Sequence, residues 1–202
     1  MEKTSQERPP IIYWPKDCKS KPAATLAIGV FDGVHEGHQY LIGECVKDAQ
    51  KRKCEAWVVT FNIDPDELFG TPHKLLTNEH RLKLLSMQDG IDGVLVLPFD
   101  RKLAGLSPNE FLDEVIAHAF TPVSIHVGTN FRFGARAAGD DETLRRWGLS
   151  QKPVCDVYIH ELFSEDGKPV SSTRIRKLIS SGDMTHAEHM LTRPYVHEED
   201  TL

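Results

Sequence analysis

Short apolar runs alternate with stretches of helical spacing through most of the chain. Apolar runs rich in β-branched and aromatic residues predict strands, and they lie at residues 25–30, 54–61, 94–97, 123–127 and 154–162. Apolar positions at helical spacing predict helices at residues 37–51, 79–87, 108–118, 170–181 and 184–191. A strand–helix–strand order requires crossover connections and therefore parallel strands. We expect an α/β fold: an open parallel sheet of the Rossmann-like kind with helices on both faces.

The segments outside this alternation are short and polar. Residues 1–21 bear several prolines and are predicted to form a tail or an edge segment. Within them, residues 11–14 (IIYW) fit two interpretations equally well, a short edge strand or a hydrophobic anchor. Residues 22–195 are predicted to form one domain, and the acidic residues 196–202 a loose tail.

A glycine-rich turn follows the first predicted strand of the domain. It runs from Gly29 to His38 and reads GVFDGVHEGH, and a helix pattern follows it. Such a turn presents backbone N–H groups and a helix N-terminus to an anion, and its glycines allow close approach of a ligand. His35 and His38 would place two imidazoles at this helix start, where they can donate to developing negative charge. The alternative is a solvated helix start, and the flanking strand and helix favour the phosphate site.

Two later segments are candidates for ligand contact. Residues 128–140 (GTNFRFGARAAGD) lack helical or strand period, and long loops inside a compact domain are usually functional. Arg132 and Arg136 are candidate phosphate clamps there, whereas Phe131 and Phe133 either pack under a planar ligand or anchor the loop, and anchoring is favoured. Residues 170–176 (VSSTRIR) open a helix with three hydroxyls, more than one cap needs, and two arginines follow in the next turn. We expect a second anion site at residues 170–176.

Composition narrows the classes of function. A formal net charge of −6 argues against bulk binding to nucleic acid or to a membrane surface, so local arginines, lysines and backbone dipoles must hold any anionic ligand. The four cysteines form no closely spaced pair, which argues against a disulfide framework or zinc site and fits a reducing cytoplasm. No apolar run approaches the length of a membrane span, and the N-terminus lacks the apolar region of a signal peptide.

Taken together, these segments resemble the adenylyltransferase module of the prokaryotic bifunctional riboflavin kinase/FAD synthetases. That module belongs to the nucleotidyltransferase group whose signature is an HxGH turn. The likeness is carried by GVFDGVHEGH at 29–38, VGTNFRFG at 127–134 with Gly139 and Asp140, VSSTRIR at 170–176 and GDMTHAEHMLTRPY at 182–195. With the strand pattern it covers roughly residues 22–195. HxGH alone would imply only the wider group, and its conjunction with FRFG and SSTRIR is more specific.

The resemblance implies a nucleotidyltransferase fold and the transfer of AMP from ATP to FMN, giving FAD and pyrophosphate with Mg²⁺. The FMN phosphate is itself the nucleophile, so the protein needs only to align an in-line attack on the α-phosphate and neutralise the developing charge. Catalytic roles are implied for His35, His38 and Arg176, with His38 as the main stabiliser of the transition state. The metal ligands stay open, and the implied partners are small-molecule nucleotides and flavin.

The same resemblance implies two sets of binding residues. The ATP-binding set comprises Gly29, Phe31, Asp32, Gly33, Gly37, Ser171, Ser172, Thr173 and Arg174. The FMN-binding set comprises Asn62, Asp64, Asn130, Phe131 and Arg132.

Three departures from the family pattern bear on activity. Asp64 stands where a His or Asn normally helps with phosphate, and a carboxylate there would repel phosphate unless it recruits Mg²⁺. Asn130 replaces the usual Asp of a DFRFG stretch. The riboflavin kinase domain that follows the RPY ending in the bifunctional proteins is absent from this sequence.

Two other functions stay open at the level of the sequence. One is another HxGH nucleotidyltransferase, such as a cytidylyltransferase or a pantetheine-phosphate adenylyltransferase, and the FRFG loop speaks against it. The other is a weakened paralogue that binds flavin or nucleotide without turnover, and its only support is Asp64 and Asn130.

Overall fold

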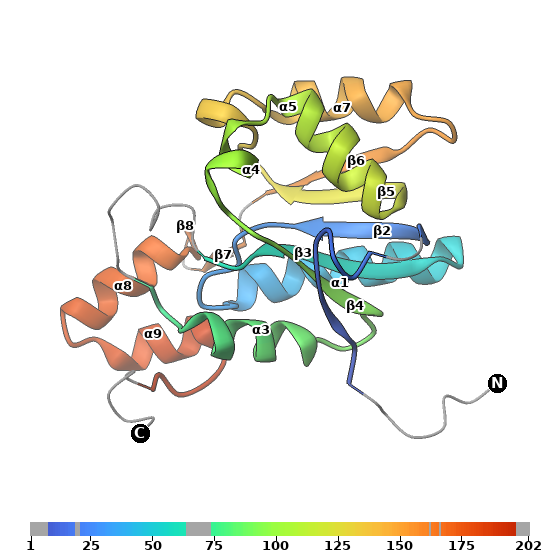
Figure 1. Cartoon of the computed structure of the whole chain (residues 1–202). Coiled ribbons are helices and arrows are strands. Elements are labelled where there is room, and N and C mark those ends of the chain that lie inside the picture. Colours follow the sequence, from blue (N-terminus) through green and yellow to red (C-terminus); the bar gives the residue numbers. More distant parts are fainter. Residues whose placement is uncertain (1–7, 19–20, 64–73, 162, 166, 197–202) are drawn as a thin grey trace.

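The computed structural model describes residues 8–18, 21–63, 74–161, 163–165 and 167–196. Six parallel strands form one sheet in the order β1-β4-β3-β2-β5-β6 (Figure 1). The strands are β1 (Ile11–Tyr13), β2 (Ala23–Ile28), β3 (Glu55–Phe61), β4 (Gly93–Leu97), β5 (Thr121–Gly128) and β6 (Asp156–His160). The predicted open parallel sheet is confirmed, and of the two interpretations of residues 11–14 the edge strand is correct, because β1 pairs in parallel with β4.

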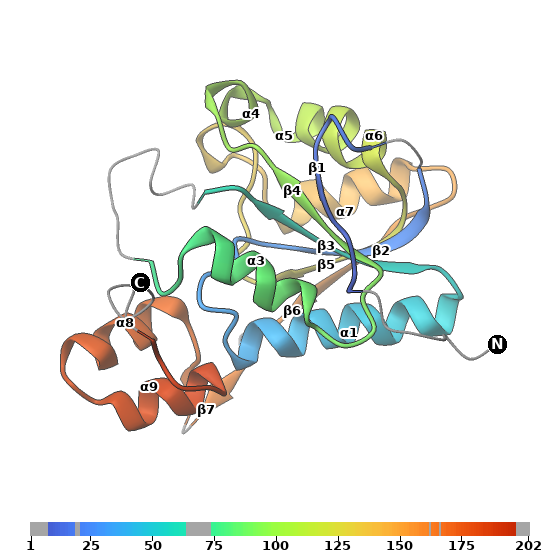
Figure 2. The ribbon, with the colours of Figure 1, turned by 60° about the horizontal axis from the view of Figure 1, so that its bottom comes forward.

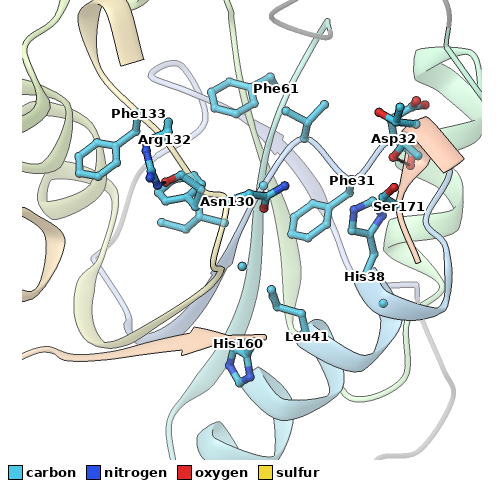
Figure 3. A pocket seen from close by; sticks show the side chains of 18 of the residues that line it. Phe31, Asp32, His38, Leu41, Phe61, Asn130, Arg132, Phe133, His160 and Ser171 are labelled. Atoms are coloured by element: carbon cyan, nitrogen blue, oxygen red, sulfur yellow. Dashed lines mark hydrogen bonds between the residues drawn. The ribbon is translucent and has the colours of Figure 1, made fainter. Parts of the chain in front are cut away.

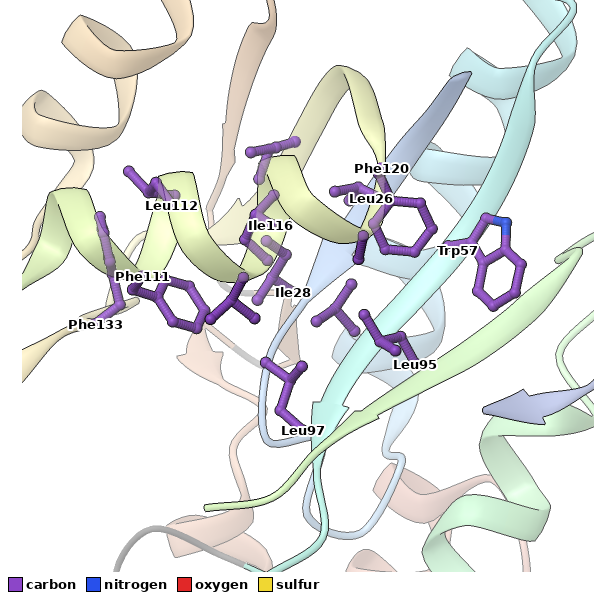
Figure 4. Packing of buried hydrophobic residues seen from close by; sticks show 14 of the residues in the cluster. Leu26, Ile28, Trp57, Leu95, Leu97, Phe111, Leu112, Ile116, Phe120 and Phe133 are labelled. Carbon is purple, nitrogen blue, oxygen red and sulfur yellow. The ribbon is translucent and has the colours of Figure 1, made fainter. Parts of the chain in front are cut away.

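Helices cover both faces of the sheet, as the alternation predicts (Figures 1 and 2). Helices α1 (Glu36–Arg52) and α3 (Asn78–Ser86) pack on one face through a cluster of small and branched apolar side chains. The opposite face is covered by the α5–η1–α6 run and by α7 (Asp141–Ser150), and Figure 4 shows Leu26, Trp57 and Phe111 in the core between them.

The predicted helix at residues 108–118 is present with a local irregularity. It is built from α5 (Pro108–Glu110), a π-helical stretch η1 (Phe111–Ile116) and α6 (Ala117–Ala119). A capping box begins this helix: the Ser107 hydroxyl accepts from the Glu110 N–H at 3.3 Å, and the Glu110 carboxylate accepts from the Ser107 N–H at 2.7 Å.

Several short elements and one longer helix are absent from the sequence prediction. The short helix α4 (Arg101–Gly105) follows β4, and α7 begins directly after the predicted loop, whose only helical element is the short 3₁₀ turn η2 (Ala135–Ala137). Helix α7 is amphipathic but has only two large buried anchors, Leu144 and Trp147, so its apolar periodicity is weak. A small antiparallel hairpin, β7 (Ser164–Glu165) with β8 (Lys168–Pro169), lies between β6 and the last two helices.

The last two helices form a small unit with its own apolar cluster. Helices α8 (Ser172–Ser180) and α9 (Met184–Leu191) pack against each other (Figure 2). Ile175, Met190 and Leu191 are fully buried there together with Leu75, which comes from the segment before α3. This cluster fixes the N-terminus of α8 beside the turn that follows β2.

Close packing between β3 and β4 gives a test of the core. Gly93 lies opposite Trp57, and a Cβ at Gly93 would come within 2.4 Å of the indole ring. We expect Gly93→Ala to lower the free energy of unfolding by about 1–3 kcal/mol, because the buried indole, which packs on Phe120, would have to shift. Urea unfolding measures this. Gly43→Ala in α1 is the matched control, since a Cβ at Gly43 has no atom within 4 Å, and equal stability of the two variants would contradict the packing argument.

Candidate active site

A cavity of about 660 Å³ lies at the carboxyl ends of the central strands. Its walls are the turn after β2, the end of β3, the loop after β5, the end of β6 and the start of α8. Figure 3 shows Phe61, Asn130 and Arg132 on one side of the cavity and His38 and Ser171 on another. Ligands of open parallel sheets bind at this edge, so the position of the cavity agrees with the sequence prediction.

The two histidines of the turn lie face to face at the start of α1. His35 is the N-cap residue, and its Nδ1 accepts a hydrogen bond from the His38 N–H at 3.4 Å. The two rings stack with their centroids 3.5 Å apart, and the edge of Phe31 meets His38 at 5.3 Å. Burial and the nearby Arg193 lower the pKa of His35 to about 4. Burial, His35 and Arg81 lower the pKa of His38 well below its usual value, so both imidazoles are neutral at pH 7.

His38 also has an unsatisfied polar atom. Its Nδ1 is buried and, within the described part of the chain, makes no hydrogen bond. A buried polar atom without a partner is destabilising, and such atoms are rare in native structures unless a ligand or water satisfies them. His38 also lines the cavity, so an incompletely hydrogen-bonded imidazole forms part of the cavity wall.

The glycines of the turn divide into two kinds. Gly29 and Gly37 line the cavity, as expected for the ATP-binding set. Gly33 does not: it has φ of +82°, and a Cβ there would lie 2.6 Å from Leu75. Its carbonyl accepts a hydrogen bond from Arg193, so Gly33 shapes the turn rather than contacting the cavity.

Asp32 joins the turn to α8. Its carboxylate accepts from the Leu75 N–H at 3.0 Å and from Arg176 at 2.7 Å, and its carbonyl accepts from the Ser172 hydroxyl at 2.9 Å. Asp32 is buried, whereas the Arg176 side chain keeps about a third of its surface exposed to the cavity side. Two segments 144 residues apart thus form one polar wall.

The VSSTRIR segment is used only partly as the sequence predicts. Ser171, Ser172, Thr173 and Arg176 line the cavity. Ser171 is also the N-cap of α8 and accepts from the Arg174 N–H at 3.2 Å, and Thr173 accepts from Arg176 at 3.4 Å. The expectation that Arg174 contacts ATP is not supported, because Arg174 lies outside the cavity lining. Its guanidinium binds the backbone carbonyls of the β7–β8 hairpin and the Glu165 carboxylate.

Only some of the predicted FMN-binding residues line the cavity. Asn130, Phe131 and Arg132 line the cavity. Phe133 is buried against Phe111 and stacks on Phe131 with a centroid distance of 5.3 Å, which supports the anchoring interpretation for Phe133.

Of the two predicted FMN-binding residues that follow β3, Asn62 does not line the cavity. Asn62 donates its N–H to the Leu97 carbonyl and accepts from the Phe99 N–H at 2.7 Å, so it joins the ends of β3 and β4. Asp64 lies outside the described residues.

Several residues of the site were not predicted. Arg81 is buried and donates to the carbonyls of Val30 and Phe61 and to the Thr60 hydroxyl, which ties α3 to the ends of β2 and β3. Tyr40, Phe163 and His160 complete the cavity wall. A polar alternation in the last strand (DVYIH) was the available signal for His160, whereas nothing local marks Arg81 as a buried support.

Comparison with known proteins agrees with this geometry. Residues 17–174 match the family model described as FAD synthetase. The chain is 33% identical over 173 residues to the bifunctional riboflavin kinase/FMN adenylyltransferase of Escherichia coli K12, which covers 84% of this chain and 54% of that protein. It is 34% identical to the protein of the same name from Pseudomonas fluorescens, and the match covers 83% of this chain and 54% of that protein. The chain therefore spans about half the length of these curated relatives.

A solved structure shares the fold. The crystal structure described as a macrolide-efflux protein from Streptococcus pneumoniae superposes with a TM-score of 0.77 at 26% identity, over 92% of this chain and 60% of that one. In the part of this chain that the structure describes, no helix has the length and apolar character needed to cross a membrane. The family match covers both the turn after β2 and the start of the VSSTRIR segment, and on that match the chain belongs to the FAD synthetase family.

Proposed function

We propose that this chain catalyses FMN adenylyltransfer, in which ATP and FMN give FAD and pyrophosphate. The observation that carries the proposal is that two anion-binding elements, the HxGH turn and the N-terminus of α8, face one cavity. They are held together by the contacts of Asp32 with Arg176 and Ser172. Membership of the FAD synthetase family supports this reaction over those of the cytidylyltransferases and pantetheine-phosphate adenylyltransferases.

The chemistry requires alignment and charge stabilisation only. The FMN phosphate attacks the α-phosphate of ATP, and pyrophosphate leaves in line with the attack. Neutral His35 and His38 donate hydrogen bonds to the phosphates, and Arg176 neutralises the charge that develops on the leaving group. Ser171, Ser172 and Thr173 bind the triphosphate at the N-terminus of α8, where backbone N–H groups and the helix dipole favour an anion.

The loop after β5 receives the flavin. Phe131 presents half-buried aromatic surface to the cavity and is supported from below by Phe133, which suits a planar ring. Asn130 and Arg132 supply polar groups beside it. The substitution Asp64→His tests the role of Asp64. We expect this variant to keep or raise the rate of adenylyl transfer unless Asp64 recruits the metal.

Mg²⁺ enters the proposal as the ion that accompanies the ATP phosphates. Within the described residues no three His, Cys, Asp or Glu side chains form a group that could hold a metal ion. Mg²⁺ commonly takes most of its ligands from phosphates and water, with one or two carboxylates. Among the described residues, the carboxylates that line the cavity belong to Asp32 and Glu161, and Asp32 already holds Arg176, so phosphate oxygens and water would supply most of the ligands of the ion.

A cytoplasmic setting and small-molecule partners complete the proposal. Cys18, Cys45, Cys54 and Cys155 are free thiols, which is compatible with a reducing compartment. The net charge of −6 gives no field for nucleic acid or for an anionic membrane surface.

The first test is FAD formation from FMN, ATP and Mg²⁺, followed by chromatography. We expect the parent chain to form FAD and His38→Ala to lose about 10²–10³ in rate, because a well-placed donor to the transition state is removed. His118→Ala is the matched control, since His118 is exposed on α6 and lies outside the cavity. Equal rates for parent and His38→Ala would refute the role of His38. A folded parent that binds ATP but forms no FAD would favour the weakened paralogue.

The two arginines of VSSTRIR give a second test. Arg176→Gln should lower the rate of FAD formation by about 10²-fold, because its guanidinium faces the cavity. Arg174→Gln should leave kcat and the KM for ATP near the parent values and lower the melting temperature instead, because Arg174 holds the β7–β8 hairpin. Steady-state kinetics and thermal melts separate the effects. A loss of activity with Arg174→Gln at unchanged stability would restore the sequence prediction that Arg174 binds ATP.

A further inference from the structure

A buried polar strip crosses the fold between α1 and the β5–β6 edge of the sheet. Ile125 and Val127 point from β5 into the apolar core, but the alternate positions carry Ser124 and His126, which are 0% and 3% exposed. On β6 the residues that pair with His126 and Gly128 are Tyr158 and His160. Buried polar side chains are destabilising unless they are hydrogen-bonded, so the strip must be satisfied internally.

The strip begins at an ionised carboxylate. Asp48 of α1 accepts from Arg52 Nε at 2.8 and 2.9 Å and from the Ser124 hydroxyl at 2.6 Å. Burial alone would raise its pKa, but the hydrogen bonds from Ser124 and Arg52 hold the pKa of Asp48 below its ordinary value. Asp48 is therefore a carboxylate at pH 7 and can only accept hydrogen bonds.

This carboxylate fixes the proton of the next residue. His126 Nε2 lies 3.3 Å from the Ser124 oxygen and 3.4 Å from the Asp48 carboxylate. Burial and the neighbouring His160 lower the pKa of His126 to about 4, so its ring carries one proton. Ser124 has already donated its own proton to Asp48, so both neighbours of Nε2 offer lone pairs, and the proton of His126 lies on Nε2.

The protonation of His126 in turn determines which nitrogen of His160 is protonated at the cavity. His126 Nδ1 is therefore unprotonated and accepts a hydrogen bond from His160 Nε2 at 2.9 Å. Burial lowers the pKa of His160 as well, so at pH 7 its single proton is used in that bond and its Nδ1 is bare. His160 lines the cavity beside Tyr40, with a ring-centroid distance of 6.2 Å, and Figure 3 shows it among the lining side chains. No hydrogen bond within the described chain uses its Nδ1.

We propose that His160 is a substrate-binding residue that accepts, at Nδ1, a hydrogen bond from a heteroaromatic N–H group, and that Asp48 and His126 are positioning residues that hold it in this tautomer. The inference rests on the proposed function for its ligands. Both substrates carry such a donor, the 6-amino group of adenine in ATP and the imide N–H of the flavin in FMN. A site built to accept from such a donor rejects analogues that lack it.

Binding of each substrate alone tests this without turnover. We measure calorimetric dissociation constants of ATP and of FMN for the parent, for His160→Phe and for His118→Phe as the exposed matched control. His160→Phe should weaken one of the two substrates by roughly tenfold, the effect of one lost hydrogen bond, and leave the other unchanged. His118→Phe should change neither.

Analogues identify which substrate donates. If adenine is the donor, purine riboside triphosphate, which lacks the 6-amino group, should bind the parent about tenfold more weakly than ATP and bind His160→Phe no more weakly than ATP does. If the flavin is the donor, N3-methyl-FMN should show the same pattern. Unchanged affinity for both substrates in His160→Phe, or a parent that binds neither, overturns the inference. Absence of FAD formation with these affinity changes intact would refute only the proposed reaction.

Imidazole ¹⁵N chemical shifts test the positioning residues. In the parent, Nδ1 of His160 should show the shift of a bare nitrogen and Nε2 that of a protonated one. Asp48→Asn introduces an amide that can donate a hydrogen bond, so the donor–acceptor order from residue 48 to His160 is no longer fixed. The chemical shift of His160 Nδ1 should then move toward the protonated value. A thermal melt checks that the variant is folded. A parent spectrum with a protonated Nδ1, or an unchanged spectrum in folded Asp48→Asn, overturns the positioning role.

Discussion

The contact between Asp32 and Arg176 is the constraint on which the site depends. It joins the turn after β2 to a helix that begins 140 residues later, and it is reinforced by the Ser172 hydroxyl on the Asp32 carbonyl. Arg193, which follows α9, adds hydrogen bonds to the Gly33 and Val34 carbonyls, so the HxGH turn and the α8–α9 unit are joined at several points. The turn and the α8 N-terminus therefore line one cavity in a geometry fixed by folding, which is the preorganisation that the proposed phosphoryl transfer requires.

The sequence was sufficient for the architecture and for the main segments that line the cavity. Apolar runs and helical spacing predicted the parallel sheet, and the glycine-rich turn and VSSTRIR, which were expected to bind anions, both line the cavity. Helix α7 was missed because two buried anchors give little periodicity. Gly33, Asn62 and Arg174 were assigned to ligands from motif membership, but the structure uses Gly33 for a left-handed turn, Asn62 to join strand ends and Arg174 to hold a hairpin.

The roles of supporting residues could not be predicted, since they depend on contacts between distant segments. Arg81 reads as a surface residue of an amphipathic helix, yet it is buried against the carbonyls of two strands. Likewise the polar alternation of β5 and β6 is visible in the sequence, but the direction of its hydrogen bonds depends on Asp48, 78 residues before His126. Sequence motifs identify residues that line the cavity better than they identify the residues that hold those side chains in place.

The strand order has a consequence for the order in which the chain is made. β2 pairs with β3 on one side and with β5 on the other, so one edge of the first central strand stays open until residues 121–128 have left the ribosome. Open edges are templates for unwanted pairing during synthesis. The α8 helix that closes the cavity emerges later still, so a growing chain carries a nearly complete sheet before it carries a complete site.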